Sequence, residues 1–134
     1  MLHILLIEDN RGDALLVREA IRLSSVEANV TIAKDGEEAL RFLRSPRFTL
    51  DIVILDLSIP KIGGLEVLEH HRPSENSAPV IVFTSSSHPQ ERARAFELGA
   101  KEYLVKPTEL VEYMDTIRNA IEHWAGEVGK GATV

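Results

Sequence analysis

The apolar run from Ile52 to Leu55, which leads directly into the carboxylate of Asp56, restricts the fold more than any other stretch of the sequence. Three of its four residues are β-branched, and an unbroken run of this kind is typical of a strand buried on both faces of a parallel sheet. Pro60, Gly63 and Gly64 follow and predict that the strand ends in a loop. Asp56 is therefore expected at the carboxyl end of a central strand, the edge of an α/β sheet where ligands bind.

Four more strands are predicted, each separated from the next by a helix. Short apolar or β-branched runs predict strands over residues 2–7, 29–33, 80–83 and 103–105. Apolar residues at helical spacing predict helices over 13–24, from Asp35-Gly36 up to Pro46, over 65–71, from 89 up to Gly99, and over 108–124 with Thr108 as N-cap. This alternation predicts a parallel sheet covered by helices on both faces, and we expect the flavodoxin-like strand order 2-1-3-4-5.

Composition favours one domain and excludes several classes of function. With 134 residues, 44% of them hydrophobic, we expect a single domain over residues 1–125 and a glycine-containing flexible tail over 126–134. A net charge of −6 without a basic run argues against nucleic-acid binding and against binding to anionic membranes. The absence of cysteine excludes disulfides and thiolate catalysis, and it suits a cytoplasmic location. No segment approaches the roughly 20 apolar residues of a membrane span.

Polar residues with complementary chemistry follow four of the predicted strands. They are Glu8 and Asp9, Asp56, Thr84, and Lys106. If those strands are neighbours, the three carboxylates meet, and each raises the pKa of the others unless a cation intervenes. Oxygen ligands without His or Cys suit Mg²⁺, which could draw a phosphate donor onto Asp56. Lys106 would add a point charge, and the Thr84 hydroxyl could bind a phosphate oxygen.

Each of these features has an ordinary structural explanation when it is taken alone. Acidic pairs at strand ends are most often solvated loops or helix caps, and an Asp after a strand is often a turn former. A Lys-Pro pair is mostly a surface turn, and a Thr after a strand usually caps the next helix. Their occurrence at the same end of four strands argues against coincidence and for one functional crevice.

Together these motifs resemble the receiver domain of two-component response regulators. The resemblance covers residues 2 to about 124 and implies an α/β, flavodoxin-like (CheY-like) fold. Within that family, the segments EDNRGDALLVREA and IEHW are most similar to the stand-alone, Rcp-type regulators that partner bacterial phytochromes. The motifs that carry the resemblance are Glu8-Asp9-Asn10, the run ILDLSIP around Asp56 followed by Gly64, the pair Thr84-Ser85, and YLVKP at 103–107.

The resemblance implies a phosphoacceptor and a metal site. Asp56 would accept the phosphoryl group. Glu8, Asp9 and Asp56, together with the backbone carbonyl of Ser58, would hold Mg²⁺. One departure from the family pattern lies nearby, because this chain has Gly63-Gly64 where the family often has an acid before the glycine. That change removes no ligand.

The resemblance also implies a conformational switch. Thr84 and Lys106 would contact the aspartyl phosphate, and Tyr103 would swing inward as Thr84 moves toward the phosphate. Ser58 and Ser86 stand at the positions that flank the path of an attacking water in the family, so small hydroxyls at both leave the dephosphorylation rate open.

The sequence therefore favours a phosphorylation switch that accepts its phosphoryl group from a sensor histidine kinase. The signal would leave by protein contact, through a downstream or phosphorelay partner, or a homodimer formed by the fourth helix, fifth strand and fifth helix. Beyond phosphotransfer and autodephosphorylation, we expect no enzyme activity. One alternative is a Mg²⁺-dependent phosphohydrolase, although Ser58 stands where such an enzyme needs a second acid. The other is a docking module that is independent of phosphorylation.

Overall fold

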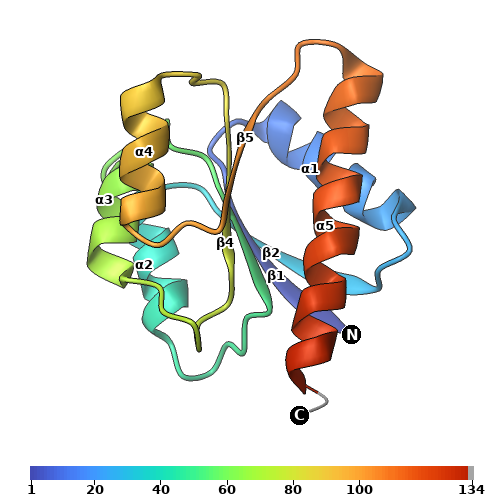
Figure 1. Cartoon of the computed structure of the whole chain (residues 1–134), viewed down its shortest axis with the longest axis horizontal. Helices are drawn as coiled ribbons and strands as arrows, with labels where there is room; N and C mark the ends of the chain where they lie inside the picture. The colour runs from blue at the N-terminus through green and yellow to red at the C-terminus, as the bar shows by residue number, and fades with distance from the viewer. Residues whose placement is uncertain (133–134) are drawn as a thin grey trace.

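The computed structural model describes the backbone of residues 1–132 and the side chains of residues 1–129. Over residues 1–132, strands and helices alternate along the chain (Figure 1). The elements in order are β1 (Leu2–Ile7), α1 (Arg11–Leu23), β2 (Ala28–Ala33), α2 (Gly36–Arg44), β3 (Ile52–Leu55), α3 (Gly64–His71), β4 (Val80–Thr84), α4 (Pro89–Glu97), β5 (Glu102–Val105) and α5 (Leu110–Ala132).

All five strands are parallel and form one sheet in the order β2-β1-β3-β4-β5, which confirms the predicted topology. Helices α1 and α5 cover one face of the sheet, and α2, α3 and α4 cover the other (Figure 1). The central strand β3 serves both layers, because successive side chains of a strand point to opposite faces. Ile52 and Ile54 pack under α1 and α5, whereas Val53 and Leu55 pack under α2 and α3.

Two helix starts differ from the prediction, and a capping side chain explains each. Helix α1 begins at Arg11 because the side chain of Asn10 accepts a hydrogen bond from the backbone N–H of Asp13 at 2.9 Å. Thr108 was wrong as the N-cap of the last helix. The carboxylate of Glu109 instead accepts from two backbone N–H groups of the first turn of α5, at 2.7 and 3.2 Å.

The predicted end of the last helix, near Trp124, was also wrong, because α5 continues to Ala132. Glycine costs a helix only about 1 kcal/mol, and packing outweighs that cost here. Trp124 and Val128 lie against the core cluster under α5, and the Trp124 indole N–H donates to Glu102 at 2.8 Å. Residues 133–134 of the predicted tail lie outside the described residues. Among residues 1–132, no helix is both long and apolar enough to cross a membrane.

Candidate functional site

The sheet itself places two carboxylates side by side at its carboxyl edge. Strands β1 and β3 are neighbours, with Ile7 paired to Leu55, so the next residues, Glu8 and Asp56, leave the sheet together. Their backbones stay tied to it, because the Asp56 N–H donates to the Ile7 carbonyl at 3.0 Å. Both acids are buried, with 3% and 5% of their surface exposed, whereas Asp9 is exposed. The site therefore has a buried floor and one side open to solvent.

Lys106 reaches the same carboxylates from the end of β5. Its backbone N–H donates to the Thr84 carbonyl at 2.7 Å, which continues the β4–β5 pairing and aims the side chain across the sheet edge. The ammonium nitrogen lies 2.6 Å from Glu8 Oε1 and 2.9 Å from Asp56 Oδ2. Burial alone would disfavour the ammonium, but its hydrogen bonds to Glu8 and Asp56 outweigh that cost and raise the pKa of Lys106. Lys106 is therefore a permanent cation.

One lysine does not balance the acids around it. Burial, together with the nearby Asp56 carboxylate, raises the pKa of Glu8 to about 7 despite the opposing effect of Lys106. One carboxylate oxygen from each of Glu8, Asp9 and Asp56 lies within 4.8 Å of the other two. An all-oxygen cluster with excess negative charge suits a hard divalent cation, so these residues fit such an ion.

The loop after β3 fixes the orientation of the Asp56 carboxylate. The backbone N–H of Ser58 donates to Asp56 Oδ1 at 3.1 Å, while Lys106 binds Oδ2, so both oxygens have a partner. Gly64 closes the loop by donating to the Leu57 carbonyl at 3.0 Å. A Cβ at Gly64 would stand only 2.7 Å from the Asp56 carbonyl oxygen and 2.5 Å from Leu57 Cα. This close approach explains the glycine.

Thr84 and Tyr103, the predicted switch residues, meet at Ser86. Thr84 is fully buried at the end of β4, and its hydroxyl accepts from the Ser86 backbone N–H at 3.5 Å. Tyr103 is buried as well, and its hydroxyl donates to the Ser86 carbonyl at 2.8 Å, so the ring points inward. The Ser86 hydroxyl in turn donates to Glu91 of α4 at 2.7 Å. The β4–α4 loop is therefore held by β5 and by α4.

A family model for the response regulator receiver domain matches residues 4–118, which includes every residue of this site. The chain belongs to that family. Receiver domains are signalling modules and not classical enzymes. The predicted family and the predicted CheY-like fold are thereby confirmed.

Several individual proteins are similar to this receiver. FilR2 of Methanothrix harundinacea, a probable methanogenesis regulatory protein, is 33% identical over 129 residues, covering 92% of this chain and 83% of FilR2. The response regulator Rcp1 of Synechocystis is 32% identical over 130 residues, covering 90% and 87%. Other curated relatives are longer, and the chain spans 54% of the length of one of them at 34% identity.

Two crystal structures of response regulators superpose closely on this receiver. The Mn²⁺-bound form of Rcp1 has a TM-score of 0.83 at 30% identity, over 92% of this chain and 94% of that one. The phosphorylated cyanobacterial phytochrome response regulator RcpA has a TM-score of 0.85 at 29% identity, over 92% and 93%. The predicted similarity to the Rcp type is therefore confirmed.

Two residues of the receiver's site were missed by the sequence analysis. Asp13, in the first turn of α1, has its Oδ2 atom 3.3 Å from Lys106 Nζ. Its Oδ1 atom accepts a 2.6 Å hydrogen bond from the hydroxyl of Tyr113 on α5. Burial and this hydrogen bond raise the pKa of Tyr113, which therefore remains a donor. One feature of the sequence could have indicated that Tyr113 is buried. It stands four residues before Ile117, on the apolar stripe of the last helix.

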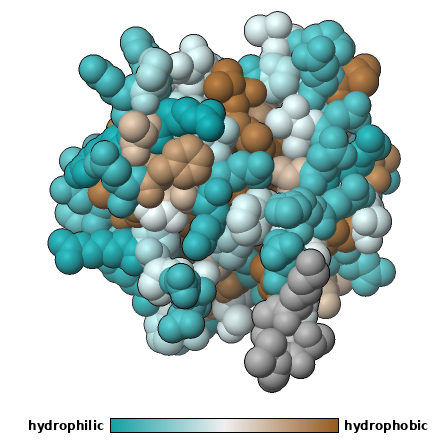
Figure 2. Space-filling view, in the orientation of Figure 1, coloured by the Kyte–Doolittle hydropathy of each residue, from teal (hydrophilic) through white to brown (hydrophobic). Residues whose placement is uncertain are grey.

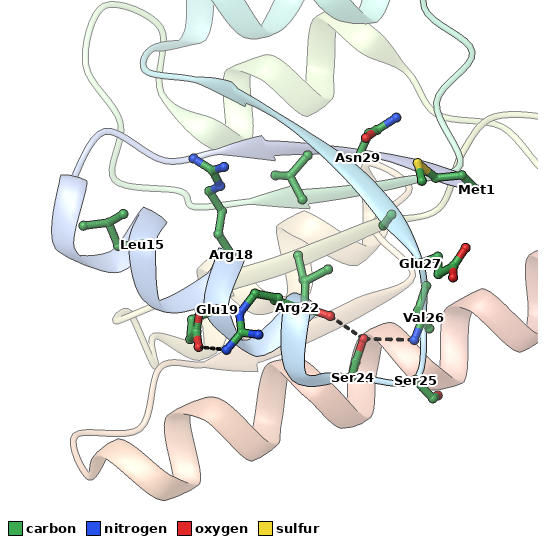
Figure 3. Close-up of a pocket in the computed structure, with 13 residues that line it drawn as sticks. Met1, Leu15, Arg18, Glu19, Arg22, Ser24, Ser25, Val26, Glu27 and Asn29 are labelled. Carbon is green, nitrogen blue, oxygen red and sulfur yellow. Dashed lines mark hydrogen bonds and ion pairs between the residues drawn. The ribbon is translucent and has the colours of Figure 1, made fainter.

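The receiver also has a hollow of about 760 Å³ between α1 and the edge strand β2 (Figure 3). Its lining includes Met1 and Val26, so it reaches the amino edge of the sheet, opposite the acidic site. Arg22 lies in this hollow, but its guanidinium is bonded to Glu19 of the same helix (Figure 3). Among the described residues, the cluster of metal-type ligands lies at the carboxyl edge and not in this hollow, so the candidate functional site is the carboxyl edge.

Proposed function

We propose that this receiver is the phosphorylation switch of a two-component system, with Asp56 as the acceptor of a phosphoryl group from a phosphohistidine of a sensor kinase. The observation that carries the proposal is the arrangement at Asp56. Its buried carboxylate is 2.9 Å from the Lys106 ammonium and shares an oxygen cluster with Glu8 and Asp9. A carboxylate of this kind is a nucleophile whose attack is helped by positive charge close to the reacting phosphorus.

In the proposed reaction, a carboxylate oxygen of Asp56 attacks the phosphorus in line with the phosphorus–nitrogen bond. The new oxygen–phosphorus bond forms as the bond to the kinase histidine breaks, and the imidazole leaves and takes up a proton. The Ser58 backbone N–H steadies the Asp56 carboxylate at Oδ1, and Lys106 binds the other oxygen. Lys106 is also close enough to offer its charge to the oxygens of the transferred group.

The divalent ion of this proposal is Mg²⁺, held by Glu8, Asp9, Asp56 and the backbone carbonyl of Ser58. When bound, it would neutralise negative charge on the phosphoryl oxygens. Support comes from the three converging carboxylates, which supply only oxygen ligands. The Mn²⁺-bound form of the similar protein Rcp1 agrees with a divalent ion.

The proposed output follows from Thr84 and Tyr103. A phosphoryl group on Asp56 would draw the Thr84 hydroxyl away from Ser86, and the β4–α4 loop and Tyr103 would adjust with it. The surface that this movement would change carries exposed apolar residues on α4, β5 and the first turn of α5. Figure 2 shows apolar surface on this side of the molecule. We assign this face to a phosphorylation-dependent homodimer, or to a downstream or phosphorelay partner.

The sensor kinase is proposed to be of the phytochrome type, because the similar proteins include the phytochrome response regulator RcpA. Autodephosphorylation is proposed as well, with a rate that depends on the small hydroxyls of Ser58 and Ser86. The cytoplasmic location and the division at residue 125 stay predictions.

The test is labelling with acetyl phosphate or phosphoramidate in the presence of Mg²⁺. The wild-type protein should take an acid-stable, hydroxylamine-labile label, and Asp56→Asn should take none. A wild type that stays unlabelled, or an Asp56→Asn variant that labels equally, would refute the function. Size-exclusion chromatography with and without beryllofluoride, on the same samples, reports whether the modified form dimerises.

A further inference from the structure

The ammonium of Lys106 has a third carboxylate partner, for which the proposed phosphotransfer assigns no part. Asp13 Oδ2 lies 3.3 Å from the ammonium nitrogen, beside Glu8 Oε1 at 2.6 Å and Asp56 Oδ2 at 2.9 Å. The Asp13 side chain is 26% exposed and that of Lys106 is 7% exposed, so the contact is partly shielded from solvent. Among the described residues, the cluster of converging metal-type ligands contains Glu8, Asp9 and Asp56 but not Asp13.

Asp13 is held in place from the opposite side by α5. Its Oδ1 atom accepts the Tyr113 hydroxyl at 2.6 Å, so one carboxylate joins Lys106 to a residue one hundred positions along the chain. Tyr113 is 5% exposed, and its ring packs edge-to-face against Phe83 with the centroids 5.0 Å apart. Phe83 directly precedes Thr84, and the Lys106 ammonium lies 5.9 Å from its ring centroid. The contact is therefore part of a packed arrangement of α1, β4 and α5.

The three carboxylate partners of Lys106 would have different roles during phosphorylation. Glu8 and Asp56 are the residues expected to bind the divalent ion, and Asp56 is also the expected acceptor. Both would therefore give up part of their interaction with Lys106 during the reaction. Asp13 is not one of those ligands, so its Oδ2 atom can stay beside Lys106 while its Oδ1 atom accepts the Tyr113 hydroxyl.

We infer that Asp13, oriented by Tyr113, is a positioning residue that holds the Lys106 ammonium over the acceptor carboxylate while Glu8 and Asp56 bind other groups. The inference rests on the proposed function. It assigns a part to the first turns of α1 and α5, which then act on phosphotransfer through Lys106. Neither Asp13 nor Tyr113 touches the reacting atoms.

The test compares Tyr113→Phe and Asp13→Asn with a matched control, Trp124→Phe. Tyr113→Phe keeps the ring that packs on Phe83 and removes only the hydroxyl. Trp124→Phe removes a hydrogen-bond donor of the same helix whose acceptor is Glu102, at 2.8 Å. The initial rate of labelling by phosphoramidate with Mg²⁺ should fall about tenfold in the two site variants, because small misplacements of a reacting charge cost this much or more. The control should match the wild type within about twofold, since its lost hydrogen bond lies outside the reacting geometry.

A second measurement reports on Lys106 without any phosphoryl donor. In metal-free protein labelled with ¹⁵N at the lysine side chains, the Lys106 ammonium should give its own proton–nitrogen signal, assigned by its loss in Lys106→Met. Tyr113→Phe should shift this signal or broaden it by faster exchange with water, and Trp124→Phe should leave it unchanged. A merely structural role of Tyr113 would lower the unfolding midpoint without moving the signal.

Failure of the inferred role of Asp13 can be distinguished from failure of the proposed phosphorylation. A wild type that takes no label refutes the proposed function, and the inference falls with it. A wild type that labels normally, with Tyr113→Phe matching it in both rate and Lys106 signal, overturns the inference alone. If Asp13→Asn does not fold, Tyr113→Phe decides the question by itself.

Discussion

Protonation of Glu8 should compete with binding of the divalent ion near neutral pH. Glu8 is 2% exposed in its side chain, and burial beside Asp56 raises its pKa from an ordinary 4.5 to about 7. Only the deprotonated carboxylate is a metal ligand. The apparent affinity for Mg²⁺ should therefore rise with pH across the range where Glu8 loses its proton.

The size of the effect follows from that pKa. With a pKa of about 7, roughly one tenth of Glu8 is deprotonated at pH 6 and roughly nine tenths at pH 8. The dissociation constant for Mg²⁺ should therefore fall about tenfold between pH 6 and pH 8, which corresponds to about 1.4 kcal/mol of binding free energy.

The metal-free protein should show the opposite trend in its own stability. A raised pKa means that the folded state holds the Glu8 proton more tightly than the unfolded state does. This contribution to the free energy of unfolding is fully present below pH 4.5 and is lost as pH rises through about 7. The rise in the pKa of Glu8 from 4.5 to about 7 corresponds to a loss of about 3 kcal/mol in the free energy of unfolding. Added Mg²⁺ should restore more stability at pH 8 than at pH 6.

Isothermal titration with Mg²⁺ at pH 6, 7 and 8, paired with urea unfolding at the same pH values, measures both trends. Glu8→Gln is the control, because it keeps the size of the side chain and removes the titrating proton. Its Mg²⁺ affinity should be weaker at every pH and nearly flat between pH 6 and pH 8. If the wild-type affinity is also flat over that range, burial and the neighbouring Asp56 do not raise the pKa of Glu8 to about 7.

Three further predictions concern the helices around the sheet. Gly36→Ala should destabilise the fold by about 1–3 kcal/mol, because a Cβ there would overlap the Ile62 carbonyl oxygen and stand 2.5 Å from Ile62 Cβ. Gly126→Ala, where a Cβ would meet no described atom within 4 Å, should instead stabilise α5 by about 0.5–1 kcal/mol. If the urea midpoints of both variants shift from the wild type in the same direction, this expectation is contradicted. Glu109→Ala should cost about 0.5–2 kcal/mol by uncapping α5, and an unchanged urea midpoint would show that the cap contributes nothing.

The sequence was sufficient for the sheet and for the residues at its carboxyl edge because both depend on short-range patterns. The buried run at β3 and the polar residue after it lie within five consecutive positions, and parallel strands bring such ends together wherever the helices lie. Glu8, Asp56 and Lys106 were therefore predictable as neighbours. Their distances were not, because those depend on side-chain rotamers.

The contacts that were missed depend on how helices pack. Asp13 meets Tyr113 only because α1 and α5 lie side by side on one face of the sheet, and no local pattern encodes that register. The length of α5 was missed for a related reason. The glycine at 126 favours a helix end locally, but the packing of Trp124 and Val128 on the core overrides it.

Lys106 is expected to contribute both to the stability of the fold and to phosphotransfer, so its removal would change both at once. Glu8 and Asp56 are both nearly inaccessible to water, and two such carboxylates without a cation would cost several kcal/mol. A Lys106→Met variant would therefore lose labelling for either of two reasons, a missing catalytic charge or a destabilised site. Tyr113→Phe changes neither the charge nor the number of acids around Asp56. A slower reaction in that variant can be attributed to the position of Lys106.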